Sequence, residues 1–165
     1  MIEYLIKRFF HSARRTLRRQ QNQTLPFGDY VSDGSEKARY LGFGKGSTIY
    51  DSSLVFGHVR VGSDVWIGPF TLLDGSGGLL KIGDRSYVSA GTQIYTQDTV
   101  DHTLSDAPVA RAPVTIGQRC HIGPNTIILK GVTIGDNVVI EANSVVSSDL
   151  PNGCRAKGSP AQPVD

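Results

Sequence analysis

The chain has 165 residues, of which 19% are charged and 8% are aromatic, and it contains 19 glycines. This length fits one domain, and abundant valine and isoleucine with a net charge of only +2 exclude a disordered chain. Two cysteines, Cys120 and Cys154, form neither a disulfide framework nor a CxxC zinc pattern. No apolar run has the length of a membrane span or the form of a signal peptide, so we expect a cytoplasmic protein.

The positive charge is concentrated in the first 20 residues. Six lysines and arginines oppose Glu3 there, a net charge of +5, which leaves −3 for the rest of the chain. A slightly acidic body does not attract polyanions, so we expect no nucleic-acid partner. The basic residues are Lys7, Arg8, Arg14, Arg15, Arg18 and Arg19.

Residues 1–22 have the pattern of a basic amphipathic helix, because apolar residues recur at spacings of three and four. The apolar stripe consists of Ile2, Leu5, Ile6, Phe9, Phe10, Ala13 and Leu17. Two interpretations stay open: the stripe packs on its own domain or a partner subunit, or residues 1–20 contact an anionic membrane peripherally. Residues 23–44, with turn-forming stretches at 20–23 and 28–34, are expected as a linker and N-terminal cap.

A six-residue repeat organises the rest of the chain. Aliphatic residues occupy fourteen positions in three blocks, each position six residues after the last. They are Ile49, Val55, Val61, Ile67 and Leu73, then Ile82, Val88 and Ile94, and then Ile116, Ile122, Ile128, Ile134, Ile140 and Val146. Period six fits short strands joined by tight turns, with glycine easing the corners. Three strands close one triangular coil, so residues 45–150 are predicted to form a parallel β-solenoid of four to five coils.

Two interruptions break the repeat. Ile82 follows Leu73 by nine positions, which predicts a small bulge at 74–78, and Ile116 follows Ile94 by 22 positions. The second gap predicts a loop extension over 95–115, and residues 151–165 are expected as a C-terminal cap. Irregular loops on a rigid scaffold are where functional residues concentrate, so the loop is the first place to look for a site.

The motifs 114–117, 120–125, 130–136 and 158–161 resemble the hexapeptide-repeat, or isoleucine-patch, acyltransferases, and the likeness covers roughly residues 45–163. The stretches 66–70 and 74–78 are similar to a branch associated with polysaccharide and nucleotide-sugar gene products. The resemblance implies an all-β fold, a parallel left-handed β-helix with an N-terminal amphipathic α-helix. It also implies a homotrimer that moves an acetyl group from acetyl-coenzyme A to a hydroxyl or amine of a sugar or nucleotide-sugar in surface polysaccharide synthesis.

The resemblance implies a catalytic histidine, and glutamine stands at the position where it is expected. Counting back from Ile116 without gaps, it falls in the stretch 95–98, where similar relatives read Tyr-Thr-His-Asp and this chain has Gln97. Glutamine does not titrate and cannot act as a general base. One hypothesis is therefore that the chain is a β-helix trimer with impaired catalysis that serves as a binding or scaffold protein.

The competing hypothesis gives the role of the base to His102, five residues further along the same loop. The ordinary pKa of histidine, near 6.5, suits a base at neutral pH. A carboxylate could orient the ring, and Asp98 is a better partner than the adjacent Asp101 because neighbouring residues in extended chain point apart. The candidate catalytic residues are thus His102, Gln97, Asp98 and Asp101.

The coenzyme A contacts that the resemblance implies carry over in part. The candidates are His121, Gly123, Ala142, Ser147, Ser148, Lys157, Gly158 and Pro160. Ser148 replaces a frequent lysine, which weakens phosphate binding by charge, and Lys157 is the preferred substitute. His121 stands where relatives carry an aromatic residue facing the acyl channel.

A metal-dependent enzyme of the carbonic-anhydrase type is the third reading. It uses a similar helix with three histidine ligands, which must converge on one metal ion. His58 and His121 occupy different corners of the repeat, and no HxxxxH pair exists. We therefore expect no metal.

Overall fold

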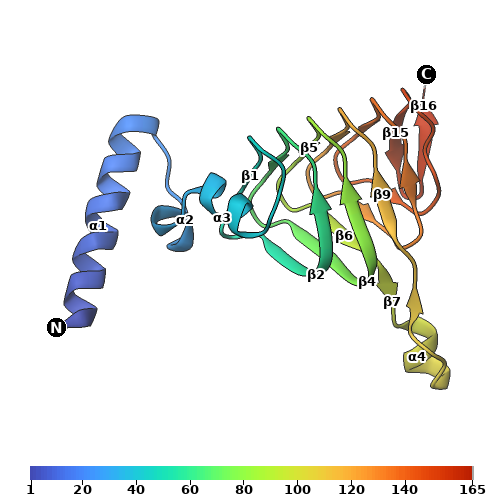
Figure 1. Cartoon of the computed structure of the whole chain (residues 1–165), viewed down its shortest axis with the longest axis horizontal. Helices are drawn as coiled ribbons and strands as arrows, with labels where there is room; N and C mark the ends of the chain where they lie inside the picture. The colour runs from blue at the N-terminus through green and yellow to red at the C-terminus, as the bar shows by residue number, and fades with distance from the viewer. Residues whose placement is uncertain (165) are drawn as a thin grey trace.

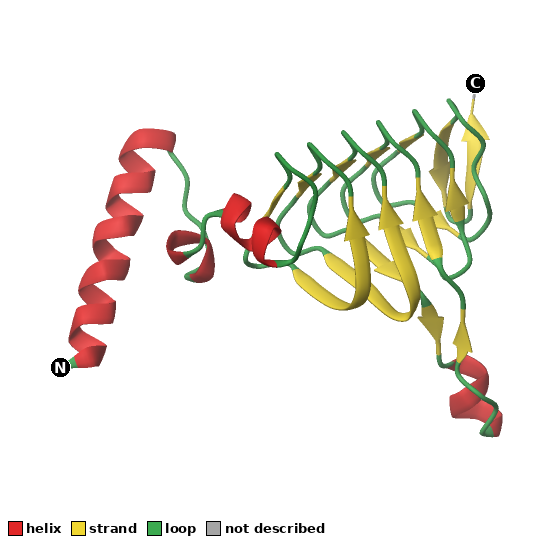
Figure 2. Ribbon diagram, viewed as in Figure 1, coloured by secondary structure: helices red, strands yellow, loops and turns green. Residues whose placement is uncertain are grey.

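The structure, a computed structural model, describes residues 1–164 as a stack of strand coils with helices at its N-terminal end. The coils run from β1 to β16, and the helix α1 stands beyond the first coil, at the opposite end from the C-terminus (Figure 1). A second helical extension, α4, projects from the side of the stack (Figure 2). The predicted fold class is confirmed.

Each coil has three faces, and like positions of successive coils pair with one another. The first face is a seven-stranded sheet made of β1 (Thr48–Ile49), β3 (Trp66–Ile67), β5 (Tyr87–Val88), β10 (His121–Ile122), β13 (Val139–Ile140), β15 (Arg155–Gly158) and β16 (Ala161–Val164). All pairs in it are parallel except β15 with β16, which forms an antiparallel cap.

The second and third faces share two long strands, β2 (Leu54–Val61) and β4 (Leu72–Ile82), which continue around the corner between them. The second face adds β6 (Gln93–Tyr95), β11 (Ile127–Ile128) and β14 (Val145–Val146), and the third face adds β9 (Val114–Ile116) and β12 (Thr133–Ile134). The corner between these two faces carries both interruptions of the repeat.

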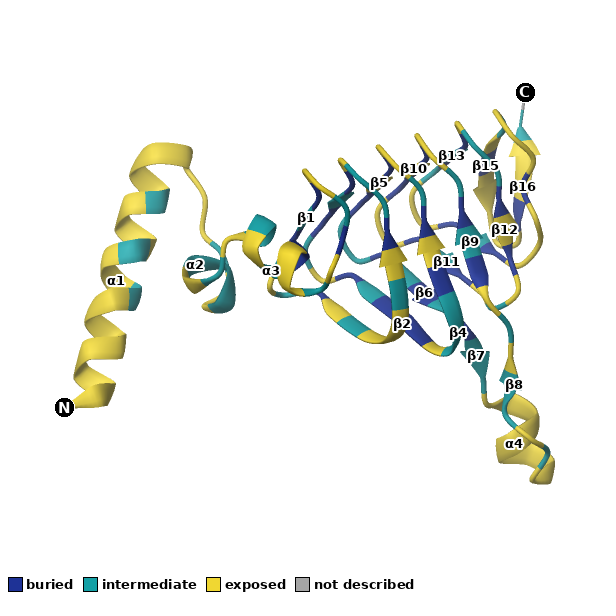
Figure 3. Ribbon diagram, viewed as in Figure 1, coloured by how far each residue is buried: buried dark blue, intermediate teal, exposed yellow. Residues whose placement is uncertain are grey.

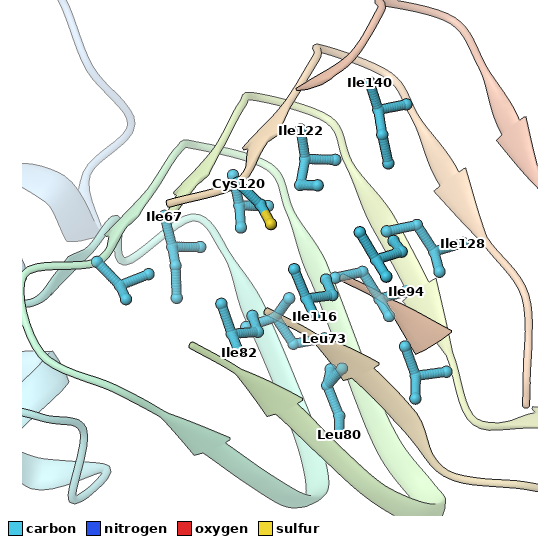
Figure 4. Close-up of a cluster of buried hydrophobic side chains, with 14 of the residues drawn as sticks. Ile67, Leu73, Leu80, Ile82, Ile94, Ile116, Cys120, Ile122, Ile128 and Ile140 are labelled. Carbon is cyan, nitrogen blue, oxygen red and sulfur yellow. The ribbon is translucent and has the colours of Figure 1, made fainter. Parts of the chain in front are cut away.

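The hexad positions form the core. Thirteen of the fourteen predicted aliphatic side chains are buried, and Val55 is half-buried. They stack in ladders along the axis, as Figure 4 shows for Leu73, Ile94 and Ile128. Residues four positions after a hexad aliphatic, such as Val65, Thr92 and Val138, are buried as well. Exposed residues lie at the outer edges of the coils (Figure 3). Removal of this apolar surface from water is the main stabilising term of the fold.

Glycine is needed at some corners because a side chain there would clash with the next coil, as Gly117 illustrates. A Cβ on Gly117 would lie 2.5 Å from the carbonyl oxygen of Gly135 in the next coil. The same corner is tied by Asp136, whose Oδ1 accepts a hydrogen bond of 2.9 Å from the backbone N–H of Gln118. That N–H lowers the pKa of Asp136. Coils therefore stack closely only where no side chain intervenes.

Residues 28–40, expected as linker and cap, contain two short helices instead, α2 (Gly28–Val31) and α3 (Gly34–Tyr40). The missed pattern is an N-cap: Asp33 Oδ1 accepts from the backbone N–H of Ser35 at 2.9 Å, and Glu36 follows Asp33 by three residues. Ala38 is buried against the first coil. The Lys37 ammonium donates to three backbone carbonyl oxygens of that coil, those of Tyr50, Asp51 and Ser53.

The predicted basic helix is present as α1 (Ile2–Gln21), and none of its residues is buried. Its Phe10 ring lies 5.4 Å, between centroids, from both Phe27 and Tyr30 at α2. Within residues 1–164, no helix combines the length and the apolar character needed to cross a bilayer.

We expect the substitution Ile116→Ala to lower the free energy of unfolding by about 2–5 kcal/mol, because it opens a cavity in a fully buried ladder. Urea denaturation followed by circular dichroism measures this loss. Val55→Ala, at the half-buried hexad position, is the matched control and should cost less. Equal losses for the two variants would contradict the ladder as the source of stability.

Candidate active site

The larger interruption forms an arm that leaves the third coil. Its base is the antiparallel pair β7 (Gln97–Asp98) and β8 (Ala110–Arg111), and its tip is α4 (Val100–Ser105) (Figure 1). The repeat resumes in register, because Ile94 pairs with Ile128 and Ile116 with Ile134. Residues 114 and 115, expected in the loop, already belong to β9.

The smaller interruption of the second coil interlocks with the base of this arm. A Cβ on Gly77 would lie 2.8 Å from Cβ of Gln97, so only glycine permits this approach. The backbone N–H of Gly77 donates to Thr96 Oγ1 at 2.9 Å, and that hydroxyl donates to the carbonyl oxygen of Asp74 at 2.8 Å. The two insertions thus fix one another at the same corner of the prism.

A pocket of about 530 Å³ opens where they meet. Its lining residues are Asp74, Tyr95, Gln97, Asp98, Thr99, Val100, Leu129 and Lys130. The volume lies within the range of small-molecule sites. Asp74, Tyr95 and Leu129 each follow an inward aliphatic of the second face, so they occupy one column of three successive coils.

A nearly buried carboxylate lies at the inner wall of the pocket. Asp74 is 7% exposed. Its Oδ1 accepts from the backbone N–H of Ser76 at 2.8 Å, and its Oδ2 accepts from Gln97 Nε2 at 3.3 Å. Gln97, at the position where the resemblance predicts a histidine, therefore contacts a carboxylate.

An ion pair lies at the rim. The Oδ2 atom of Asp98 is 3.3 Å from the Lys130 ammonium, and its Oδ1 accepts from the backbone N–H of Val100 at 2.9 Å. The Val100 N–H, and after it Lys130, hold the pKa of Asp98 below its ordinary value. Asp98 is thus paired with Lys130 instead of orienting a histidine.

His102 and Asp101 lie on α4, exposed and outside the pocket lining. The Nδ1 atom of His102 is 2.8 Å from the carbonyl oxygen of Ala107, a contact within the tip of the arm. Of the four candidate catalytic residues, the subunit brings together Gln97 and Asp98 and leaves the other two apart.

The candidate coenzyme A contacts lie in separate parts of the prism. Ser147 and Ser148, both exposed, follow β14 and lie one coil beyond Leu129 and Lys130, so they continue the edge of the pocket. Gly123 and Ala142 lie between the first and second faces, whereas Lys157 and Gly158 end β15 of the first face and Pro160 lies in the turn that follows it. At the corner of Gly123 the coils approach closely, since a Cβ on Gly123 would lie 2.5 Å from the Ala142 nitrogen.

His121 belongs to an aromatic column on the first face. Its ring stacks on Tyr87 with centroids 5.3 Å apart, and Tyr87 stacks on Trp66 at 4.1 Å. Each of the three residues directly precedes an inward aliphatic residue. This shared position in the repeat was a signal in the sequence from which the column could have been predicted.

Sequence reasoning also missed Asp74 and Lys130 as site residues. Asp74 is the one charged residue in the column that it shares with Phe56, Tyr95, Leu129 and Ser147, and this was the available sign. Across residues 1–164, no group of three or more potential metal ligands is placed to hold an ion.

A family profile described as bacterial transferase hexapeptide, six repeats, matches residues 113–148. Residues 113–148 therefore carry the hexapeptide repeat of bacterial transferases. A galactoside O-acetyltransferase of Escherichia coli is 36% identical over 87 residues, 52% of this chain and 43% of that protein. An E. coli protein assigned as an acetyltransferase of colanic acid biosynthesis is 30% identical over 107 residues, 62% and 56% of the two chains. The chain thus spans about half the length of these curated relatives.

Among solved structures, a hexapeptide-repeat acetyltransferase from Vibrio cholerae in complex with acetyl-coenzyme A superposes with a TM-score of 0.58. It is 25% identical, and the match covers 96% of this chain and 87% of that one. The likeness extends over the helical N-terminus as well as the coils, and it confirms the predicted fold.

We predict that Lys130→Met raises the pKa of Asp98, because the neighbouring ammonium is lost, while the Val100 N–H still holds it below its ordinary value. Carboxyl-carbon NMR titration measures the change. Asp136, whose pKa is lowered by Gln118, is an internal reference and should not move. An unchanged pKa of Asp98 in the variant would show that the ion pair does not persist in solution.

Proposed function

We propose that the chain transfers an acetyl group from acetyl-coenzyme A to a hydroxyl or amine of a sugar or nucleotide-sugar in surface polysaccharide synthesis. The observation that carries the proposal is the pocket at the base of the arm, whose edge continues along the coils to Ser147 and Ser148. The names of the relatives support it: one acetylates galactosides, one is assigned to colanic acid, and the Vibrio cholerae protein was solved with acetyl-coenzyme A.

The proposed working form is a homotrimer. In one subunit the pocket edge and the corner with Gly123 and Ala142 lie on different sides of the second face, so one ligand would have to span that face to touch both. A neighbouring copy that set its Gly123 corner against the pocket edge would place both sets of contacts around one coenzyme A. The exposed Lys157 is then the proposed partner of a phosphate.

The identity of the base remains a prediction. For His102 to serve, α4 would have to bring its ring to the pocket of another copy, because in its own subunit His102 contacts the Ala107 carbonyl. Loss of acetyl transfer in His102→Ala with unchanged binding of acetyl-coenzyme A supports that role, and unchanged transfer contradicts it.

A second candidate function is a binding or scaffold trimer without catalysis, and Gln97 is the observation that favours it. This reading expects binding of coenzyme A without turnover, and it expects Gln97→His to create activity. The transferase reading expects release of the coenzyme A thiol only when an acceptor is present.

We predict that acetyl-coenzyme A raises the melting temperature of the protein and that Lys157→Gln weakens its binding by about tenfold, the loss of one charge-assisted contact. Isothermal titration calorimetry measures the dissociation constants. Lys45→Gln, at an exposed corner near the N-terminal end, is the matched control and should bind like the parent. A parent protein that does not bind acetyl-coenzyme A would refute the proposed function.

We also propose that α1 holds the protein at the anionic cytoplasmic face of a membrane. Its stripe is exposed, with Ile2 at 74% and Phe9 at 49%, and the six basic residues lie around the other side of the helix. Such a helix buries its apolar face in the lipid interface while its cations meet the headgroups.

We expect the full chain to float with vesicles that contain phosphatidylglycerol, an anionic lipid. A variant lacking residues 1–20 should stay in the soluble fraction. Neutral phosphatidylcholine vesicles are the control and should retain less protein. Equal behaviour of the two chains would rule out membrane contact through α1. A shortened variant that also fails to assemble would place the apolar stripe at a subunit contact instead.

A further inference from the structure

The carboxylate of Asp74 takes part in none of the four ion pairs that the described residues 1–164 form. The nearest cation of the pocket, Lys130, is paired with Asp98. A nearly buried carboxylate without a cation is costly unless its oxygens are well hydrogen-bonded.

The hydrogen bonds of Asp74 give a structural role to only one of its two carboxylate oxygens. Oδ1 accepts the Ser76 N–H and so closes the turn, but an asparagine would do this equally well. Oδ2 has one partner, the Gln97 amide, at a long 3.3 Å. An ionised carboxylate offers about four acceptor positions, so Oδ2 retains capacity toward the pocket that Asp74 lines.

We propose that Asp74 is the catalytic residue that receives the proton of the acceptor and that the acceptor group is a primary amine. The inference rests on the proposed acetyl transfer and names its substrate class. No imidazole lines the pocket, and the charged groups there are two carboxylates and one lysine. A carboxylate is a weak base toward a hydroxyl, which keeps its proton until late, whereas the nitrogen of an attacking amine becomes acidic as its bond to carbon forms.

The arrangement supports a balanced reaction. The free amine binds with one N–H donating to Asp74 Oδ2, which the Gln97 amide holds in place. The nitrogen lone pair attacks the thioester carbonyl carbon, the C–N bond forms, and the nitrogen gives one proton to Asp74. The C–S bond then breaks with its electron pair on sulfur. The proton passes from Asp74 to that sulfur, so the products are the acetamide and the coenzyme A thiol, and Asp74 is again a carboxylate.

The test uses the full chain, acetyl-coenzyme A and a panel of nucleotide amino sugars, each with the counterpart that has a hydroxyl at the same carbon. Thiol release gives the rate and mass spectrometry gives the product. We expect at least one amine to be acetylated about 100-fold faster than its hydroxyl counterpart. Asp74→Asn should lower kcat by about 10²–10⁴-fold, the range for loss of a general base.

Asn at position 74 keeps an oxygen for the Ser76 N–H, and an unchanged melting temperature and acetyl-coenzyme A affinity would show that the variant is folded. Asp64→Asn, at an exposed corner with a positive φ that asparagine adopts readily, is the matched control and should keep the parent kcat. The rate of Asp74→Asn should also recover with rising pH more steeply than that of the parent, because hydroxide then removes the proton.

Faster transfer to hydroxyls, no transfer to any amine despite binding of acetyl-coenzyme A, or full activity of Asp74→Asn would each overturn the inference. The same holds if His102→Ala abolishes transfer while Asp74→Asn does not. These results leave the proposed function standing, whereas a parent protein that does not bind acetyl-coenzyme A refutes that function and this inference together.

Discussion

Close stacking of equivalent residues is the constraint on which the rest of the structure depends. Parallel strands in neighbouring coils lie about 4.8 Å apart, so each position in the stack lies against the equivalent position of the next coil. Ile122 lies between Val88 and Ile140 for this reason, and Gly117 must lack a side chain because the next coil lies against it. Additional residues cannot enter the stack, so the chain accommodates them only by moving outward at a corner.

The candidate site is a consequence of two such outward movements in successive coils. Either insertion alone would be an exposed loop. Together they cover Asp74, since Thr96 binds its carbonyl and Gln97 its carboxylate, and the base of the arm overlies the bulge. The base of the arm and the surrounding ladders together hold these groups in place, which agrees with polar chemistry at an irregular position of an otherwise regular scaffold.

The fold could be predicted from the sequence, because each strand contributes one inward aliphatic residue at a fixed spacing of six. This spacing is visible without knowing which strands pair. The site was less readable. Asp74 and Gln97 are 23 residues apart and meet only because their coils stack, so their contact cannot be read from spacing along the chain. His102 attracted attention through its closeness in sequence to Gln97, but the helix of α4 carries it to the tip of the arm. Asp33 and Glu36 were a local capping pattern that the linker interpretation overlooked.

The two ends of the stack determine whether copies of such a chain can add end to end. A β-helix exposes unpaired backbone groups at its first and last coils, and open strand edges invite further copies to add end to end into fibrils. At one end the ammonium of Lys37 occupies three carbonyl oxygens of the first coil, and α3 lies across it. At the other end β16 turns back antiparallel on β15. Closure of both ends removes the open strand edges along which copies of this chain would otherwise add end to end into a fibril.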